Sequence, residues 1–138
     1  MITTGAITIS KMMIVNHSLQ RLYIGKNKIG DNGISAIAGA LGKCKINELG
    51  VKGCGITLTG TRSLAAALSS NYTIRQLYLR HNPITVKGAT LILTTAVHNT
   101  GCQLQGLVFD DEYKNDEVKK MLNILEERRR QEVRHRIV

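Results

Sequence analysis

The sequence predicts an α/β solenoid, in which short strand-helix units stack to form a curved parallel sheet with helices along its outer side. Three observations predict this fold class. One apolar pattern recurs along the chain, its copies begin 27, 28 and 30 residues apart, and each copy is followed by a segment with the apolar spacing of a short helix. A period of about 20 to 50 residues is typical of repeat architectures, because a single unit cannot bury its apolar face alone.

The first half of each unit has the alternation of a short strand. The pattern is complete at residues 19–29, 46–56 and 74–84, and a fourth copy begins at Leu104 and departs after Phe109. Successive side chains of a strand point to opposite faces. The apolar residues should therefore line the core, and the residues between them should project from the concave side of the sheet.

The second half of each unit has the pattern of a short amphipathic helix. Apolar residues stand at the fourth and eighth positions after Gly33, Gly60 and Gly88. Residues at this spacing lie on the same face of a helix, so one face of each predicted helix is apolar. Gly5 begins the same register, so the chain should start on the helix of a partial repeat. We divide the predicted single domain, residues 1–138, into a partial repeat at 1–18, full repeats at 19–45, 46–73 and 74–103, and a final segment at 104–138.

The final segment leaves the repeat pattern and is predicted to form a C-terminal capping helix. Asn115 or Asp116 can cap the N-terminus of this helix, and acidic residues follow in its first turn. Arg128–Arg130 are expected late in the helix, where cations interact favourably with the helix dipole. An apolar stripe that would cover the last repeat consists of Val118, Met121, Leu122 and Leu125.

The polar strand positions define a candidate partner-binding face on the concave side of the sheet. Two tyrosines stand there among several cations, and Tyr and Arg are enriched at interface hot spots. Arg62, by contrast, should lie on the convex helix layer. The predicted binding residues are Arg21, Tyr23, Lys26, Glu48, Lys52, Gln76, Tyr78, Arg80 and His81.

The charge of the chain is unevenly distributed and indicates an acidic partner. The formal net charge is +9, and residues 1–103 contain eleven Lys or Arg against two acids, whereas residues 104–138 are balanced at eight of each. A basic body favours association with an acidic protein surface. Nucleic-acid binding by the same basic face is the alternative, and it would show a strong salt dependence. For the Arg-rich tail a nucleic-acid or membrane contact is less favoured, because glutamates are interspersed.

Several other classes of protein are disfavoured by the sequence. The three cysteines include no C-x-x-C pair and are odd in number, which argues against a disulfide framework or a zinc site and favours a reducing compartment. The four histidines lie at unrelated repeat positions, and neither H-E-x-x-H nor G-x-S-x-G occurs. No apolar run reaches the length of about 18 residues typical of a membrane span. We therefore expect no catalysis, no metal and no cofactor.

The strand around Leu22–Ile24 has no predicted strand before it. An unpaired edge of this kind templates pairing with another chain, so we expect possible self-association here unless residues 1–4 fold back over it. Two sequences, Asn16-His-Ser18 and Asn71-Tyr-Thr73, fit the N-glycosylation pattern but occupy the same repeat position. We interpret them as turn residues before a strand.

The repeat pattern resembles the leucine-rich repeats of the ribonuclease-inhibitor type. The three copies are L-x-x-L-x-I-x-x-N-x-I, I-x-x-L-x-V-x-x-C-x-I and I-x-x-L-x-L-x-x-N-x-I, and the resemblance covers residues 5 to 109. It implies a right-handed solenoid that binds proteins and has no catalytic activity. It also implies a buried structural ladder whose side chains bond the turn after each strand, formed by Asn27, Cys54 and Asn82.

The short units are also similar to the C-terminal repeats of NACHT-domain innate immune sensors, the NLR proteins. That resemblance implies a cytoplasmic ligand-sensing or regulatory role, with the nucleotide-binding part elsewhere. A GTPase-activating protein of the Ran type is a further alternative, because some proteins with this repeat type have that activity. No residue here identifies it, and a basic body is opposite to what a binder of basic ribonucleases needs.

Overall fold

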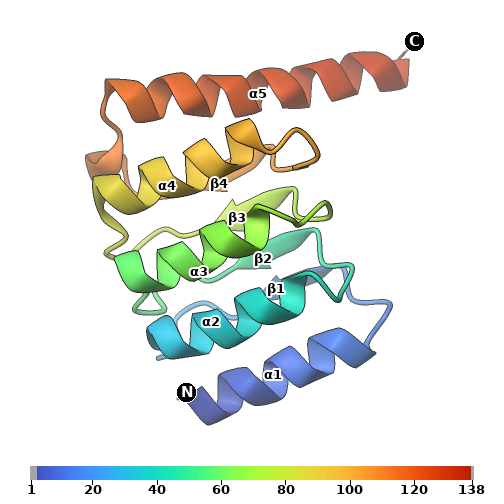
Figure 1. Cartoon of the computed structure of the whole chain (residues 1–138), viewed down its shortest axis with the longest axis vertical. Helices are drawn as coiled ribbons and strands as arrows, with labels where there is room; N and C mark the ends of the chain where they lie inside the picture. The colour runs from blue at the N-terminus through green and yellow to red at the C-terminus, as the bar shows by residue number, and fades with distance from the viewer. Residues whose placement is uncertain (1–2, 138) are drawn as a thin grey trace.

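Strands and helices alternate along the chain as the repeat pattern predicts. The computed structural model describes residues 3–137, and Figure 1 shows them as a stack that runs from the N-terminal to the C-terminal helix. The strands are β1 (Arg21–Tyr23), β2 (Glu48–Gly50), β3 (Gln76–Tyr78) and β4 (Gly106–Val108). The helices are α1 (Thr3–Val15), α2 (Gly30–Leu41), α3 (Leu58–Leu68), α4 (Thr85–His98) and α5 (Asp116–Ile137), with a short 3-10 turn, η1 (Asp111–Tyr113).

The four strands form one parallel sheet in the order β1-β2-β3-β4, and the helices lie along one side of it (Figure 1). Equivalent residues of the repeats are register partners: Leu22 pairs with Leu49, Leu49 with Leu77 and Leu77 with Leu107. The predicted α/β solenoid with a parallel sheet is therefore confirmed. Each strand has three residues, so it contributes one inward side chain and two outward ones.

The core lies between the sheet and the helices. Leu49 and Leu77 of the strands and Ile37, Leu64 and Ile92 of the helices are at most 1% exposed. Burial of one such side chain stabilises the fold by about 1.5–3 kcal/mol. Because every repeat contributes the same positions, the core continues from α1 to α5 as one cluster of buried residues.

The C-terminal helix α5 covers the last repeat. Val118 and Leu125 are buried, and Met121 and Leu122 pack half-buried against the same core. Asn115 is the cap, since its side-chain oxygen accepts a hydrogen bond from the Val118 N–H at 2.9 Å.

Arg128–Arg130 do not lie in the last turn of α5, so the expectation that these cations interact with the dipole at its C-terminus is wrong. The helix continues to Ile137, so the basic residues of its last turn are Arg134, His135 and Arg136. Arg128 instead donates to the carbonyl oxygens of Ala96 and Val97, each at 3.0 Å, near the end of α4. It therefore satisfies acceptors of a neighbouring helix, which have no partner within their own helix.

At the other end of the stack, α1 packs against α2. Ala6 and Met13 are fully buried in this contact. Within residues 3–137, β1 pairs only with β2, and Leu22 and Ile24 are half-buried. A cover of this edge by residues 1–4 would include residues 1 and 2, which lie outside the described residues, whereas Thr3 and Thr4 already belong to α1.

None of the helices in residues 3–137 combines the length and the apolar character needed to cross a membrane.

Candidate protein-binding face

The register of the sheet places the predicted side chains in rows across the strands. Arg21 pairs with Glu48, Glu48 with Gln76, and Gln76 with Gly106. The second row continues these pairings two residues further along each strand and consists of Tyr23, Gly50, Tyr78 and Val108. We call the sheet face that carries both rows, opposite the helices, the concave face.

A group of three side chains, joined by one hydrogen bond and one ion pair, stands at the first two strands. The Tyr23 hydroxyl donates to a carboxylate oxygen of Glu48, and the Arg21 Nε lies 3.6 Å from the same oxygen. The hydrogen bond to Glu48 raises the pKa of Tyr23 above its usual value of 10.0, so the side chain is a neutral phenol at neutral pH. Glu48 is consequently engaged by its neighbours and leaves the cationic character of the face largely intact.

Two aromatic rings border a hollow in the middle of the concave face. The ring centroids of Tyr23 and Tyr78 are 6.2 Å apart, and the ring planes are tilted by 51°. Gly50 lies between them in the row, and a Cβ atom at Gly50 would lie 2.5 Å from Cδ1 of Tyr23. The absent side chain therefore leaves room for the ring. The hollow has a volume of about 320 Å³ and is lined by Tyr23, Gly25, Gly50, Lys52 and Tyr78.

Cations follow the hollow where the strands continue into their turns. Lys52 and Arg80 are exposed at equivalent positions after β2 and β3, and the position after β4 is Asp110. Lys26 and His81 occupy the next position in their repeats, both exposed. The basic residues thus gather over the first three strands, where Glu48 is the acid already engaged by Arg21 and Tyr23, and further acidic residues follow the fourth strand.

Lys26, Gly53 and His81 share a left-handed backbone conformation, with φ values of 60°, 62° and 63°. The Lys26 N–H donates to Lys52 O at 2.7 Å and the Gly53 N–H to Arg80 O at 3.0 Å. The His81 N–H instead donates to the Asp110 carboxylate at 3.1 Å. Lys26 and His81 therefore stand at a regular turn on the rim of the concave face rather than within a strand.

Asn82 joins its turn to the preceding repeat. Its side-chain oxygen accepts hydrogen bonds from the N–H groups of Cys54 and Ile56, at 2.9 and 3.0 Å, and its side-chain nitrogen donates to Val51 O at 2.9 Å. The Cys54 thiol lies 3.4 Å from Ile24 O, and burial raises the pKa of this thiol. Both side chains are buried and connect neighbouring repeats.

Asn27 differs from the other two members of the expected ladder. It is exposed, and its side-chain nitrogen donates only within its own turn, to Ile24 O at 2.8 Å and Gly25 O at 3.2 Å. The expectation of a buried position is therefore wrong for Asn27. The physical reason is its place at β1, since no strand within residues 3–137 lies on the side where a preceding repeat would stand.

A second set of asparagines bonds the helix ends. The Asn71 side chain donates to Leu41 O at 3.1 Å and accepts from the Ile74 N–H at 2.8 Å. Asn99 donates in the same way to Leu68 O at 2.9 Å. Leu41 and Leu68 are the last residues of α2 and α3, so these side chains satisfy helix C-terminal carbonyls of the preceding repeat.

Asp31 makes a structural connection that the sequence pattern did not reveal. Its carboxylate accepts hydrogen bonds from the N–H groups of Thr57 and Gly60, at 2.8 and 3.0 Å, and from the Thr57 hydroxyl at 2.5 Å. An acid on α2 thus caps the N-terminus of α3. The one sequence feature that could have indicated this role is that Asp31 is one of only two acids in the basic residues 1–103.

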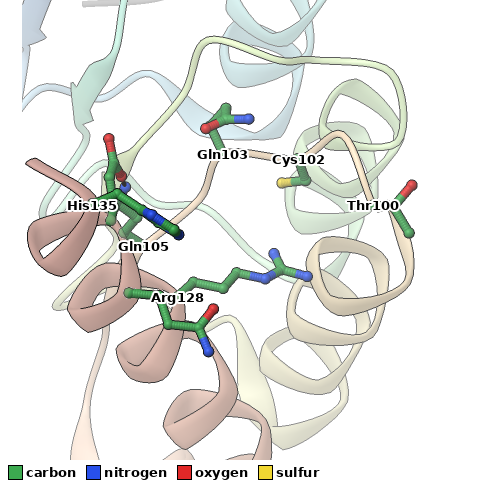
Figure 2. A pocket seen from close by; sticks show the side chains of 8 residues that line it. Thr100, Cys102, Gln103, Gln105, Arg128 and His135 are labelled. Carbon is green, nitrogen blue, oxygen red and sulfur yellow. Dashed lines mark hydrogen bonds between the residues drawn. The ribbon is translucent and has the colours of Figure 1, made fainter. Parts of the chain in front are cut away.

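Glu132 anchors the C-terminal half of α5. Arg75 donates to its carboxylate at 2.6 Å, Gln105 donates to its other oxygen, and Arg136 donates at 3.0 Å. A groove of about 410 Å³ lies beside this anchor, between α5 and the loop that follows α4; Figure 2 shows the side chains that line it. The Arg128 guanidinium in this groove points from α5 toward the end of α4 (Figure 2).

No group of three or more His, Cys, Asp or Glu side chains that could hold a metal ion occurs within residues 3–137. His81 approaches Asp110, with 3.7 Å between Nδ1 and the carboxylate, but both atoms stand on the rim beside a turn. The features gathered on the concave face are aromatic rings and charges, which are suited to recognition.

Comparison with known proteins agrees with the repeat pattern and the fold. A family model described as "Leucine Rich repeat" matches residues 15–38 and 70–93. The chain is 34% identical over 120 residues to "Ribonuclease inhibitor" of Sus scrofa, which covers 86% of this chain and 26% of that protein. The chain therefore contains leucine-rich repeats of the ribonuclease-inhibitor type.

A second group of relatives is named for a NACHT domain. "NACHT, LRR and PYD domains-containing protein 3" of Homo sapiens is 32% identical over 105 residues, which are 75% of this chain and 10% of that protein. The chain thus spans about a tenth of the length of that relative and about a quarter of the length of ribonuclease inhibitor.

Two solved structures have the same fold. A chain described as Leiomodin-1 Actin-Binding Site 2 superposes with a TM-score of 0.81 at 19% identity and covers 97% of this chain and 77% of its own length. The C-terminal domain of tropomodulin from Caenorhabditis elegans gives a TM-score of 0.70 at 14% identity, with 97% and 96% covered. At these identities the likeness shows the fold alone.

Proposed function

We propose that the chain is a non-catalytic protein-binding module that recognises a partner with an acidic surface through its concave face. The observation that carries the proposal is the open hollow beside the paired rings of Tyr23 and Tyr78, with Lys52 in its lining and Arg80 at the equivalent position of the next repeat. Aromatic and guanidinium groups are enriched among residues that dominate binding energies. Leucine-rich repeats of the relatives' type typically serve as binding modules, which supports this function.

The proposed setting is a regulatory or ligand-sensing part of an NLR-like immune receptor in the cytoplasm. The supporting observation is the similarity to proteins whose names include a NACHT domain and leucine-rich repeats. Because the match covers about a tenth of these relatives, activities of their other parts do not transfer to this chain.

The test compares a variant that should weaken binding to the partner with a variant that should leave binding unchanged. A partner is first isolated by pull-down, and its affinity is then measured for Tyr78→Ala, Arg80→Ala and for Arg62→Glu on α3. We expect the double variant to weaken binding by at least about 2 kcal/mol, as for central interface residues. The free energy of unfolding should change by less than about 1 kcal/mol, because Leu77 and Leu79 provide the core contacts of this strand.

Charge reversal at Arg62 provides the matched control. Arg62 is exposed on α3, so the reversal should leave affinity for the partner nearly unchanged. If the double variant binds as tightly as the original protein while Arg62→Glu loses affinity, the helices carry recognition and the proposed face is wrong.

A further inference from the structure

The hollow beside Tyr23 and Tyr78 has the size of a site for one side chain. Its volume of about 320 Å³ is at the lower limit of the roughly 300–1,000 Å³ found for small-molecule pockets. Its aromatic border comes from two strands that are not adjacent, β1 and β3, and the strand between them contributes glycine. The two ring centroids are only 6.2 Å apart and the Tyr23 ring lies over Gly50, so an inserted group would pack against this pair of rings rather than between them.

The rings favour an aromatic occupant. Aromatic pairs prefer offset or edge-to-face arrangements with centroids about 4.5–7 Å apart. Tyr23 and Tyr78 already form such a pair, with centroids 6.2 Å apart and planes tilted by 51°, and a third aromatic ring in the adjoining hollow could extend it. The Tyr23 hydroxyl is held by Glu48, so the position of this ring is fixed before any ligand arrives. A held ring loses less conformational freedom on binding.

The charges around the hollow favour a carboxylate beside that aromatic group. Lys52 belongs to the lining of the hollow, and Arg80 occupies the equivalent position of the next repeat. Neither side chain has an ion-pair partner among the described residues. Both cations are thus available to a ligand.

We propose that the hollow beside Tyr23 and Tyr78 receives one aromatic side chain of an acidic peptide segment, with a neighbouring carboxylate bound by Lys52 or Arg80. This inference rests on the proposed function and specifies the chemistry of the partner at that site. A peptide is favoured over single-stranded nucleic acid because Asp110, Asp111 and Glu112 interrupt the basic track at the fourth repeat. Binding of nucleic acid without sequence preference uses a continuous positive groove.

The experiment is a double-mutant cycle with synthetic peptides. The parent peptide has one central Phe between Asp residues in a Gly-Ser background; one derivative has Phe→Ala, and another has Asp→Asn at the flanking positions. Affinities are measured for the whole chain and for Gly50→Ala, in which the new Cβ atom displaces the Tyr23 ring. The control variant is Gly39→Ala on α2, where a Cβ atom meets nothing within 4 Å.

We expect the unmodified chain and Gly39→Ala to prefer the Phe peptide over the Ala peptide by about tenfold, as for a well-seated aromatic residue. Gly50→Ala should lose this preference but keep its preference for Asp over Asn. The double variant Lys52→Ala, Arg80→Ala should show the reverse pattern. Tyr78→Leu provides a second test of the hollow if Gly50→Ala does not fold.

Equal affinities for the Phe and Ala peptides overturn the inference, and so does a Phe preference that survives both Gly50→Ala and Tyr78→Leu. Displacement of the peptide by oligothymidylate at equal concentration also overturns it, since the face would then be a nucleic-acid site. A different result contradicts the proposed function: a captured protein partner whose affinity is unchanged by the double variant Tyr78→Ala, Arg80→Ala. Loss of that partner without any Phe preference leaves the function intact and rejects only the aromatic peptide.

Discussion

Asn82 and Asn27 occupy the same repeat position, yet within residues 3–137 only Asn82 has the strand and turn of a preceding repeat to bond. Replacing Asn82 with Ala would leave the buried N–H groups of Cys54 and Ile56 without an acceptor. Each such loss costs about 1–3 kcal/mol, so we expect Asn82→Ala to lower the free energy of unfolding by about 3 kcal/mol or more. Urea denaturation followed by circular dichroism measures this change.

Asn27→Ala is the matched control for that measurement. Its side chain is exposed and bonds only its own turn, so the free energy of unfolding should fall by less than about 1 kcal/mol. Equal losses for the two variants would mean that the cross-repeat bonds of Asn82 contribute nothing beyond the local turn.

At the scale of elements, the attachment of α5 should depend on pH. The hydrogen bond from Arg75, together with Arg136, holds the pKa of Glu132 below its ordinary value of 4.5. A lowered carboxyl pKa contributes stability that is present above pH 4.5 and is lost as the pH falls through the folded-state value. We therefore expect the urea midpoint to decrease below pH 4.5 partly because the α5 anchor weakens.

Glu132→Gln isolates this contribution, because other acids also titrate in the same range. Asp111 and Glu126 have lowered pKa values as well, owing to Lys114 and Arg129. The variant should be less stable than the original protein at pH 7, and the difference should shrink toward pH 3. A difference that stays constant with pH would show that the anchor depends on geometry rather than on the charge of Glu132.

At the scale of the whole molecule, the edge of β1 that is unpaired within residues 3–137 should permit association between copies. The Ile24 N–H donates to Gly50 O, so the Tyr23 N–H points away from β2, toward the open edge. Tyr23→Pro removes that donor without removing a bond to β2 and should abolish any dimer that pairs along this edge. Light scattering over a concentration series measures the association.

Tyr23→Ala is the control, since it removes the ring and keeps the N–H group. A dimer that survives Tyr23→Pro, or one lost equally in Tyr23→Ala, does not form by strand pairing. If the original protein stays monomeric at high concentration, the edge does not associate under these conditions.

The fold followed from the sequence because the repeat offset fixes the register. Once Leu49 and Leu77 are recognised as equivalent, their flanking residues must share rows, and the observed rows contain the pairs that the alignment predicts. The connections through Asp31, Arg128 and Glu132 did not follow. They join residues 26 to 57 positions apart through side chains that stand outside the repeated pattern.

The sequence predicted which tyrosines border the hollow but not the shape of the hollow. Tyr23 and Tyr78 were expected in the same row, but the role of Gly50 depends on the direction in which the Tyr23 ring lies. A row of alternating tyrosine and glycine does not specify that direction. The hydrogen bond from the Tyr23 hydroxyl to Glu48 determines it, and this bond belongs to the three-dimensional structure.

Because the side-chain amide of Asn71 is buried, glycosylation of this residue would depend on whether the chain had already folded. Only 3% of Asn71 is exposed, and its side-chain nitrogen, the atom that an oligosaccharide would modify, donates to Leu41 O. Asn16, in the other matching tripeptide, is exposed. If the chain were directed artificially into a glycosylating compartment, sugar at Asn16 would show only that the chain had entered that compartment. Sugar at Asn71 would show that the chain was modified before the repeats had packed together.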